Sequence, residues 1–215
     1  MIEITKRPIL ILATPRTGST ALGVLIKTQC NDMTIPYFIE PDYDGLEKIQ
    51  TFIDFSKTSK NFIVKIQALN LHRYGEEIST YLLKSDDVYR IRITRRNLVD
   101  QIASFYIAMF RNKEWHFRAA NNRAINDVIP IDINKLILRT KQIAEYNDCL
   151  NKIDTVFDSE LVYEDLPNMD DTGLYRTPLP LNQVEIIAAV TQTLRDFGTN
   201  GGTQTHEILI PNQVV

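Results

Sequence analysis

The sequence has few of the residues that build disulfide frameworks or metal centres. Its 215 residues include two cysteines, Cys30 and Cys149, and three scattered histidines. Neither residue type shows the spacing of a metal-ligand set, so no structural zinc site is expected. Two isolated cysteines favour a reducing compartment without disulfides. We therefore expect a cytoplasmic protein that holds no metal.

Long hydrophobic runs and a strong charge of one sign are also absent. The apolar stretch Ile9–Ala13 is too short for a membrane span or a signal-peptide core. A formal net charge of −3 gives no overall field that would attract nucleic acid. The length predicts one domain, residues 1–215, with 199–215 as a flexible tail.

Apolar runs alternate with helical patterns along the chain, which is typical of an α/β protein with a parallel sheet. The predicted strands are 9–13, 61–66, 88–94, 155–157 and 161–163. The predicted helices are 19–28, 47–55, 76–84, 97–111, 132–151 and 184–197. This order predicts three layers, in which helices flank a mostly parallel central sheet.

Residues 14–20, Thr-Pro-Arg-Thr-Gly-Ser-Thr, join the first predicted strand to a helix. Backbone N–H groups, hydroxyl groups and the Arg16 guanidinium would gather there around one point, which predicts a phosphate-binding loop. The loop has one glycine, Gly18, and no lysine after it, unlike the Walker A loop of magnesium-dependent ATPases. An ordinary strand–turn–helix, capped by Thr17 or Ser19, is the alternative.

A second group of cations follows the predicted strand 88–94. Arg95 and Arg96 end this strand, and the helix behind them carries Ser104. The carboxyl ends of parallel strands share one edge of the sheet, so we expect Arg95 or Arg96 on the same edge as Arg16. A planar guanidinium suits phosphate because it donates two parallel hydrogen bonds. Two exposed arginines at a strand end are the alternative.

Together these motifs resemble sulfotransferases that use 3′-phosphoadenosine 5′-phosphosulfate (PAPS), and the arginine in the loop is similar to bacterial carbohydrate sulfotransferases. Pro15–Thr20 matches the family's 5′-phosphosulfate loop. Arg96 and Ser104, eight positions apart, match its 3′-phosphate motif, and Tyr163 lies in a similar Tyr-Glu-Asp segment. The resemblance spans roughly residues 8 to 166. It implies a P-loop-like sulfotransferase fold and transfer of a sulfuryl group to an acceptor hydroxyl.

The resemblance also implies roles for individual residues. Arg16 and Lys65 would contact the reacting phosphosulfate, Arg96 and Ser104 the 3′-phosphate, and Tyr163 the adenine. The donor-binding residues that it implies are Arg16, Thr17, Gly18, Ser19, Thr20, Arg96, Ser104 and Tyr163. The product would be 3′-phosphoadenosine 5′-phosphate (PAP), formed without a metal.

Three features depart from the family pattern. Lys65-Ile66-Gln67 stands where cytosolic members carry Lys-Thr-His, whose histidine is the base. A glutamate expected soon after the loop is displaced to Glu40, and the C-terminal Gly-x-x-Gly-x-x-Lys has no clean copy. We expect Glu40 or else His72 to act as the base.

The acceptor and the oligomeric state are open at this point. Trp115, His116 and Phe117, flanked by arginines, fit one wall of a pocket for a small molecule or glycan, and equally a packed helical hairpin. Three other functions are also open: a P-loop-like small-molecule kinase, a non-catalytic module that binds phosphoadenosine nucleotides, and a purely structural α/β domain.

Overall fold

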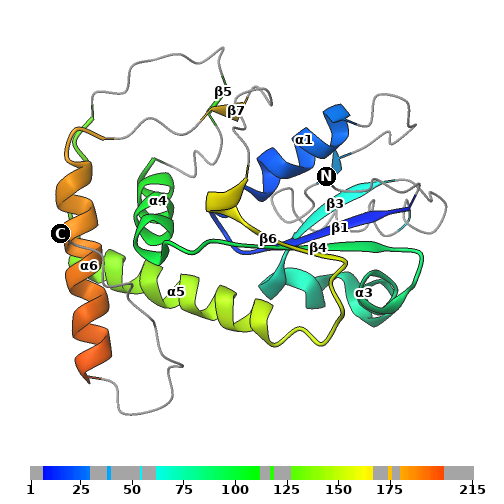
Figure 1. Ribbon diagram of the computed structural model, residues 1–215. Helices are drawn as coiled ribbons and strands as arrows, with labels where there is room; N and C mark the ends of the chain where they lie inside the picture. Colours follow the sequence, from blue (N-terminus) through cyan, green and yellow to red (C-terminus); the bar gives the residue numbers. More distant parts are fainter. Residues whose placement is uncertain are drawn as a thin grey trace.

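The centre of the fold is a parallel sheet of five strands in the order β2-β3-β1-β4-β6 (Figure 1). The computed structural model describes residues 7–29, 38–39, 54, 62–111, 117–118, 127–166, 174–175 and 180–200. The strands of the sheet are β1 (Ile9–Ala13), β2 (Phe38–Ile39), β3 (Ile63–Gln67), β4 (Tyr89–Thr94) and β6 (Ser159–Val162). This confirms the predicted α/β class.

Helices cover both faces of the sheet and complete the three layers (Figure 1). One face carries α1 (Ser19–Gln29), and the other carries the 3₁₀ helix η2 (Ala68–Tyr74), α3 (Gly75–Lys84) and α5 (Ile133–Asn151). Beside the sheet stand α4 (Leu98–Phe110) and α6 (Gln183–Asn200). The remaining elements are the antiparallel pair β5 (Phe117–Arg118) and β7 (Leu174–Tyr175), and the 3₁₀ turn η4 (Tyr163–Asp165).

Strand β1 lies in the middle of the sheet because its residues are apolar on both sides. All five are buried, and Ile9 and Ile11 pack in the cluster that contains Leu22 and Ile26 of α1. The alternate residues of β1 pack in a second cluster with η2 and α3. A strand covered on both faces is typical of a parallel sheet.

Helices α4, α5 and α6 form a separate apolar core beside the sheet. Ile102 of α4, Leu136 of α5 and Ile186 of α6 are each fully buried in it. The far end of α5 reaches the sheet, where Leu150 joins the cluster beneath β1 and β3. Helix α5 thereby fixes α4, and the loop before it, relative to the sheet.

The predicted element boundaries mostly lie within one or two residues of the observed ones, with three corrections. Residues 155–157 form no strand: Val156 is exposed, and β6 pairs with β4 only from Ser159 onward. Tyr163 lies in the turn η4, and α6 continues to Asn200. Apart from Asp54, the predicted helix 47–55 lies outside the described residues, as does the predicted tail beyond Asn200. In the part of the chain that the structure describes, no helix is both long and apolar enough to cross a membrane.

Candidate anion-binding site

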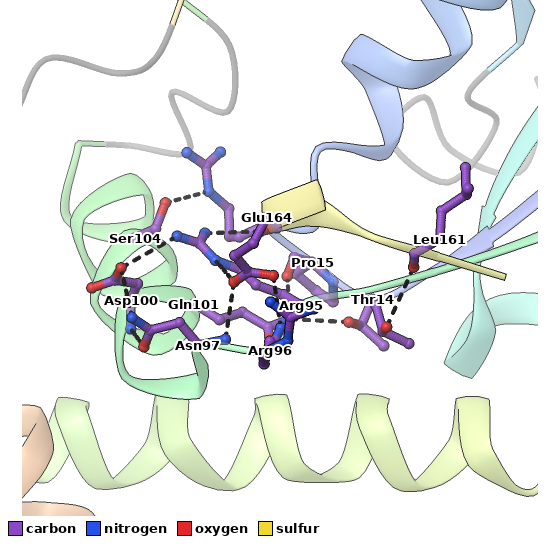
Figure 2. A network of polar contacts seen from close by, with 12 residues as sticks. Thr14, Pro15, Arg95, Arg96, Asn97, Asp100, Gln101, Ser104, Leu161 and Glu164 are labelled. Atoms are coloured by element: carbon purple, nitrogen blue, oxygen red, sulfur yellow. Dashed lines mark hydrogen bonds and ion pairs between the residues drawn. The ribbon is translucent and has the colours of Figure 1, made fainter. Parts of the chain in front are cut away.

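The candidate site lies where β1, β3, β4 and β6 end. Gln67, Ala13 and Ile93 are aligned across the sheet at this edge, and Thr94 pairs with Val162. The segments that follow β1, β4 and β6 therefore lie close together: the loop 14–18, the turn 95–97 and η4. Figure 2 shows polar side chains from these segments meeting beside α4.

The loop 14–18 has two left-handed backbone positions, Arg16 at φ 66° and Gly18 at φ 72°. Arg16 is the one non-glycine residue with positive φ in the described part of the chain, a conformation that costs about 1–2 kcal/mol. The first bond of α1 runs from Leu22 N–H to the Gly18 carbonyl at 2.9 Å. A turn with such reversals directly before a helix is typical of loops whose N–H groups bind an anion.

Gly18 is required at its position by space as well as by φ. A Cβ placed on it would lie 2.6 Å from Cδ2 of the Tyr163 ring. The ring of Tyr163 therefore packs directly on the loop backbone. This brings the predicted adenine-binding tyrosine into contact with the predicted phosphate loop.

The side chain of Arg16 reaches across to α4. Its Nε donates to Ser104 Oγ at 2.8 Å, between residues 88 positions apart in the sequence. Two predicted donor-binding residues are thus in direct contact (Figure 2).

Arg95 lies against the loop and confirms the prediction that one of the two arginines shares the edge with Arg16. Its Nη1 donates to the Arg16 carbonyl at 3.1 Å, and its guanidinium lies 4.7 Å from the centre of the Tyr163 ring. The carboxylates of Asp100 and Glu164 lie 3.9 and 3.8 Å from it. Arg95 therefore connects the loop, α4 and η4.

Arg96 is directed elsewhere. Its side chain is 60% exposed and donates to Asp165 Oδ2 at 2.8 Å, whereas Ser104 accepts from Arg16. The backbone N–H groups of Arg96 and Asn97 both donate to the Glu164 carboxylate at 2.9 Å. Burial raises the pKa of Glu164, but the backbone N–H donors and the charge of Arg95 together lower that pKa more, so it lies below its ordinary value.

Lys65 is buried in the sheet, with 1% of its surface exposed. It pairs with Ile11 and shares the face of Ile63, which packs in the cluster with α1. It lies two residues before the end of β3, and buried Gln67 occupies that end. Gln67 thus stands at the edge where the resemblance would have placed a histidine.

The two predicted bases are not brought to the loop by any described contact. His72 is exposed on η2, and its Nδ1 lies 2.8 Å from the Leu69 carbonyl of the same helix. Glu40, Trp115 and His116 lie outside the described residues. The described ranges contain no group of three His, Cys, Asp or Glu that could hold a metal ion.

Two polar residues of the site were not predicted, Gln101 and Glu164. Gln101 is fully buried, and its Nε2 donates to Thr14 Oγ1 at 3.0 Å and to the Pro15 carbonyl at 2.7 Å. Its position three residues before Ser104 puts both on one face of α4, a signal that the sequence does carry. The role of Glu164 depends on backbone N–H groups of another segment and has no such signal.

Neither models of protein families nor curated proteins give a match to this sequence.

Proposed function

We propose that the protein is a sulfotransferase that moves a sulfuryl group from PAPS to an acceptor hydroxyl. The observation that supports this best is the hydrogen bond between Arg16 and Ser104 at the carboxyl edge of the sheet. It joins the loop after β1 to the helix after β4, the two segments that in this family hold the two phosphate ends of the donor. Cations and hydroxyl groups from both segments suit a ligand with several anionic groups.

The chemistry of the donor set fits such a ligand. Arg16 supplies a guanidinium, Ser104 a hydroxyl, and the start of α1 supplies N–H groups and the positive end of a helix dipole. Tyr163 supplies an aromatic ring beside the loop. The set is rich in hydrogen-bond donors and includes an aromatic surface, as an adenine nucleotide with phosphates requires.

When bound, PAPS would supply a sulfuryl group whose S–O bond to the 5′-phosphate breaks as a new S–O bond forms to the acceptor oxygen. Arg16 and the N–H groups of Thr17–Thr20 offset the negative charge that grows on the 5′-phosphate. Buried Lys65 would provide a further cation. A base, with Glu40 and then His72 as candidates, takes the proton of the acceptor hydroxyl, which we expect to belong to a carbohydrate.

The 3′-phosphate would distinguish this donor from ATP. In this role Arg96 exchanges Asp165 for the 3′-phosphate, and its high exposure allows that movement. We expect Arg96→Ala to weaken PAP binding about tenfold, in line with loss of one charge-assisted hydrogen bond. Unchanged affinity for PAP in this variant, measured by calorimetry, would remove Arg96 from the donor site.

The kinase alternative lacks support in the residues at the strand ends. Strands β3 and β4, which flank β1, end in Gln67 and Thr94, where a magnesium-dependent kinase would need a carboxylate. A non-catalytic module that binds the same nucleotide is favoured by Gln67 in place of a basic histidine. Turnover of PAPS with an acceptor panel separates this module from the enzyme.

The test is a calorimetric titration of the protein with PAP, and AMP and ATP are titrated separately as controls. We expect micromolar binding of PAP and at least tenfold weaker binding of AMP, which lacks the 3′-phosphate. Lys135→Ala, which removes an exposed cation on α5, serves as the control and keeps the affinity. Equal binding of AMP and PAP, or binding of neither, would contradict the proposal.

A further inference from the structure

Three successive carbonyl groups of the loop 14–18 are each held by a side chain. The Thr14 carbonyl accepts from Thr17 Oγ1 at 2.9 Å. The Pro15 carbonyl accepts from Gln101 Nε2 at 2.7 Å, and the Arg16 carbonyl from Arg95 Nη1 at 3.1 Å. Two of these donors belong to the segment that follows β4, so the loop is held from outside along its length.

The orientation of the Gln101 amide is fixed by its partners. The Pro15 carbonyl can only accept, so the NH₂ group must face it, and the same group donates to Thr14 Oγ1. The side chain is fully buried, and its Oε1 has no hydrogen-bond partner among the described residues. A buried amide oxygen without a hydrogen-bond partner costs free energy, because it has lost its hydration, and this indicates that the NH₂ donors of Gln101 are there for the loop.

In a trans peptide, the carbonyl of one residue and the N–H of the next point in opposite directions. Holding the Pro15 carbonyl therefore directs the Arg16 N–H to the other side of the loop. Holding the Arg16 carbonyl does the same for the Thr17 N–H. Both peptides flank Arg16, whose φ of 66° is unfavourable for a residue with a side chain.

We infer that Gln101 and Arg95 are positioning residues that hold the loop in the conformation in which its N–H groups face an anion. Without them, Arg16 is free to return to negative φ, which turns the adjacent peptides. Their effect on the reaction is indirect, because their donors contact loop carbonyls. This inference rests on the proposed function for the identity of the anion, PAP or PAPS.

The test uses Gln101→Met, which keeps the length of the side chain and removes both donors, and Arg95→Lys, which keeps the charge. Thr140→Val is the control, because Thr140 is a buried polar residue that bonds only the Leu136 carbonyl of its own helix. Each variant is titrated with PAP and with inorganic pyrophosphate, and the crystal structure of Gln101→Met is determined. We expect a loss of affinity of about tenfold in Gln101→Met, less in Arg95→Lys, and none in the control.

The structure of Gln101→Met should show Arg16 outside the left-handed region. An unchanged loop, or unchanged affinity in a less stable protein, would overturn the inference, since a merely structural residue alters stability alone. Pyrophosphate separates the two proposals. If the unaltered protein binds pyrophosphate but not PAP, the proposed function fails, and the pyrophosphate affinities still decide the role of Gln101. If it binds neither, the loop is no anion site and both proposals fail.

Discussion

Arginines lie at both ends of strand β4, and their guanidinium groups bind different kinds of partner. At the amino end, Arg90 is 7% exposed, and its guanidinium donates to the carbonyls of Leu82, Ser85 and Val88. At the carboxyl end, Arg95 contacts groups from the loop after β1, from α4 and from η4. Arg96 beside it is mostly exposed.

The difference lies in what the donors satisfy. Arg90 donates to the Leu82 carbonyl in the last turn of α3 and to two carbonyls of the turn that follows, one of which also accepts from Val88 N–H. The carboxyl-end arginines contact carboxylates and one loop carbonyl, and an anionic ligand can replace carboxylates. A cation in a protein is thus better classified by the partners of its donors than by its burial alone.

The largest expected effect is that of Arg16→Ala on catalysis. Removal of a cation from the departing phosphate should lower turnover by about 10²–10³. The free energy of unfolding should change by less than about 1 kcal/mol, because Arg16 is only half-buried. Steady-state kinetics and denaturant unfolding measure the two effects. A large loss of stability with normal turnover would mean that Arg16, like Arg90, serves mainly to stabilise the fold.

Arg90→Met should show the opposite pattern. It removes the side-chain donor from three carbonyls, of which the Ser85 carbonyl keeps the Val88 N–H, and we expect a loss of about 2–4 kcal/mol in the free energy of unfolding. The folded protein should bind PAP as before. Arg92→Met on the same strand is the matched control, since Arg92 makes exposed contacts, a hydrogen bond to Asn151 and an ion pair with Glu160 at 3.6 Å, and it should lose less than about 1 kcal/mol. Equal losses in the two variants would contradict the structural role of Arg90.

The sequence predicted that Arg95 or Arg96 shares an edge of the sheet with Arg16, because parallel strands must bring their carboxyl ends together. It did not distinguish Arg95 from Arg96. Both lie in one short turn, and the Glu164 carboxylate, 68 residues from Arg96 and 67 from Asn97, binds the backbone that orients them. Resemblance to a family motif selected Arg96, whereas the described contacts place Arg95 on the loop.

The buried role of Arg90 was equally hidden from sequence reasoning. Alternation along β4 predicts which residues share a face of the strand, but not which element lies over that face. The carbonyl end of α3 supplies the partners of Arg90, and only the packed fold brings that end to the strand. Local patterns predicted most of the strands and helices, and the contacts between these elements determine the partners of each arginine.

Gly18→Ala should have an intermediate effect confined to the carboxyl end. Positive φ costs about 1–2 kcal/mol for alanine, and its Cβ would meet the Tyr163 ring at 2.6 Å. We expect a loss of PAP affinity together with a moderate loss of stability. The double variant Gly18→Ala/Tyr163→Ala removes the collision but leaves the cost of φ. Gly18→Ala should therefore cost less free energy of unfolding in the Tyr163→Ala background than in the unaltered protein. An equal cost in both backgrounds would show that the ring does not press on the loop.

The smallest expected effect is that of Glu164→Gln on the pH dependence of stability. The pKa of Glu164 is lowered in the folded protein by the N–H groups of Arg96 and Asn97. Its carboxylate therefore stabilises the fold above the ordinary glutamate pKa, and this contribution is lost as the pH falls through the lowered value. Replacement by glutamine should remove less than about 1 kcal/mol at pH 7 and flatten the fall in stability below about pH 5.

Asp127→Asn is the control for this prediction. The pKa of Asp127 is also lowered, by its hydrogen bond from Arg111 at the far end of α4, so this variant should flatten the profile without affecting PAP binding. If Glu164→Gln left both the profile and PAP affinity unchanged, the two N–H bonds would not hold the turn that presents Arg95 to the loop.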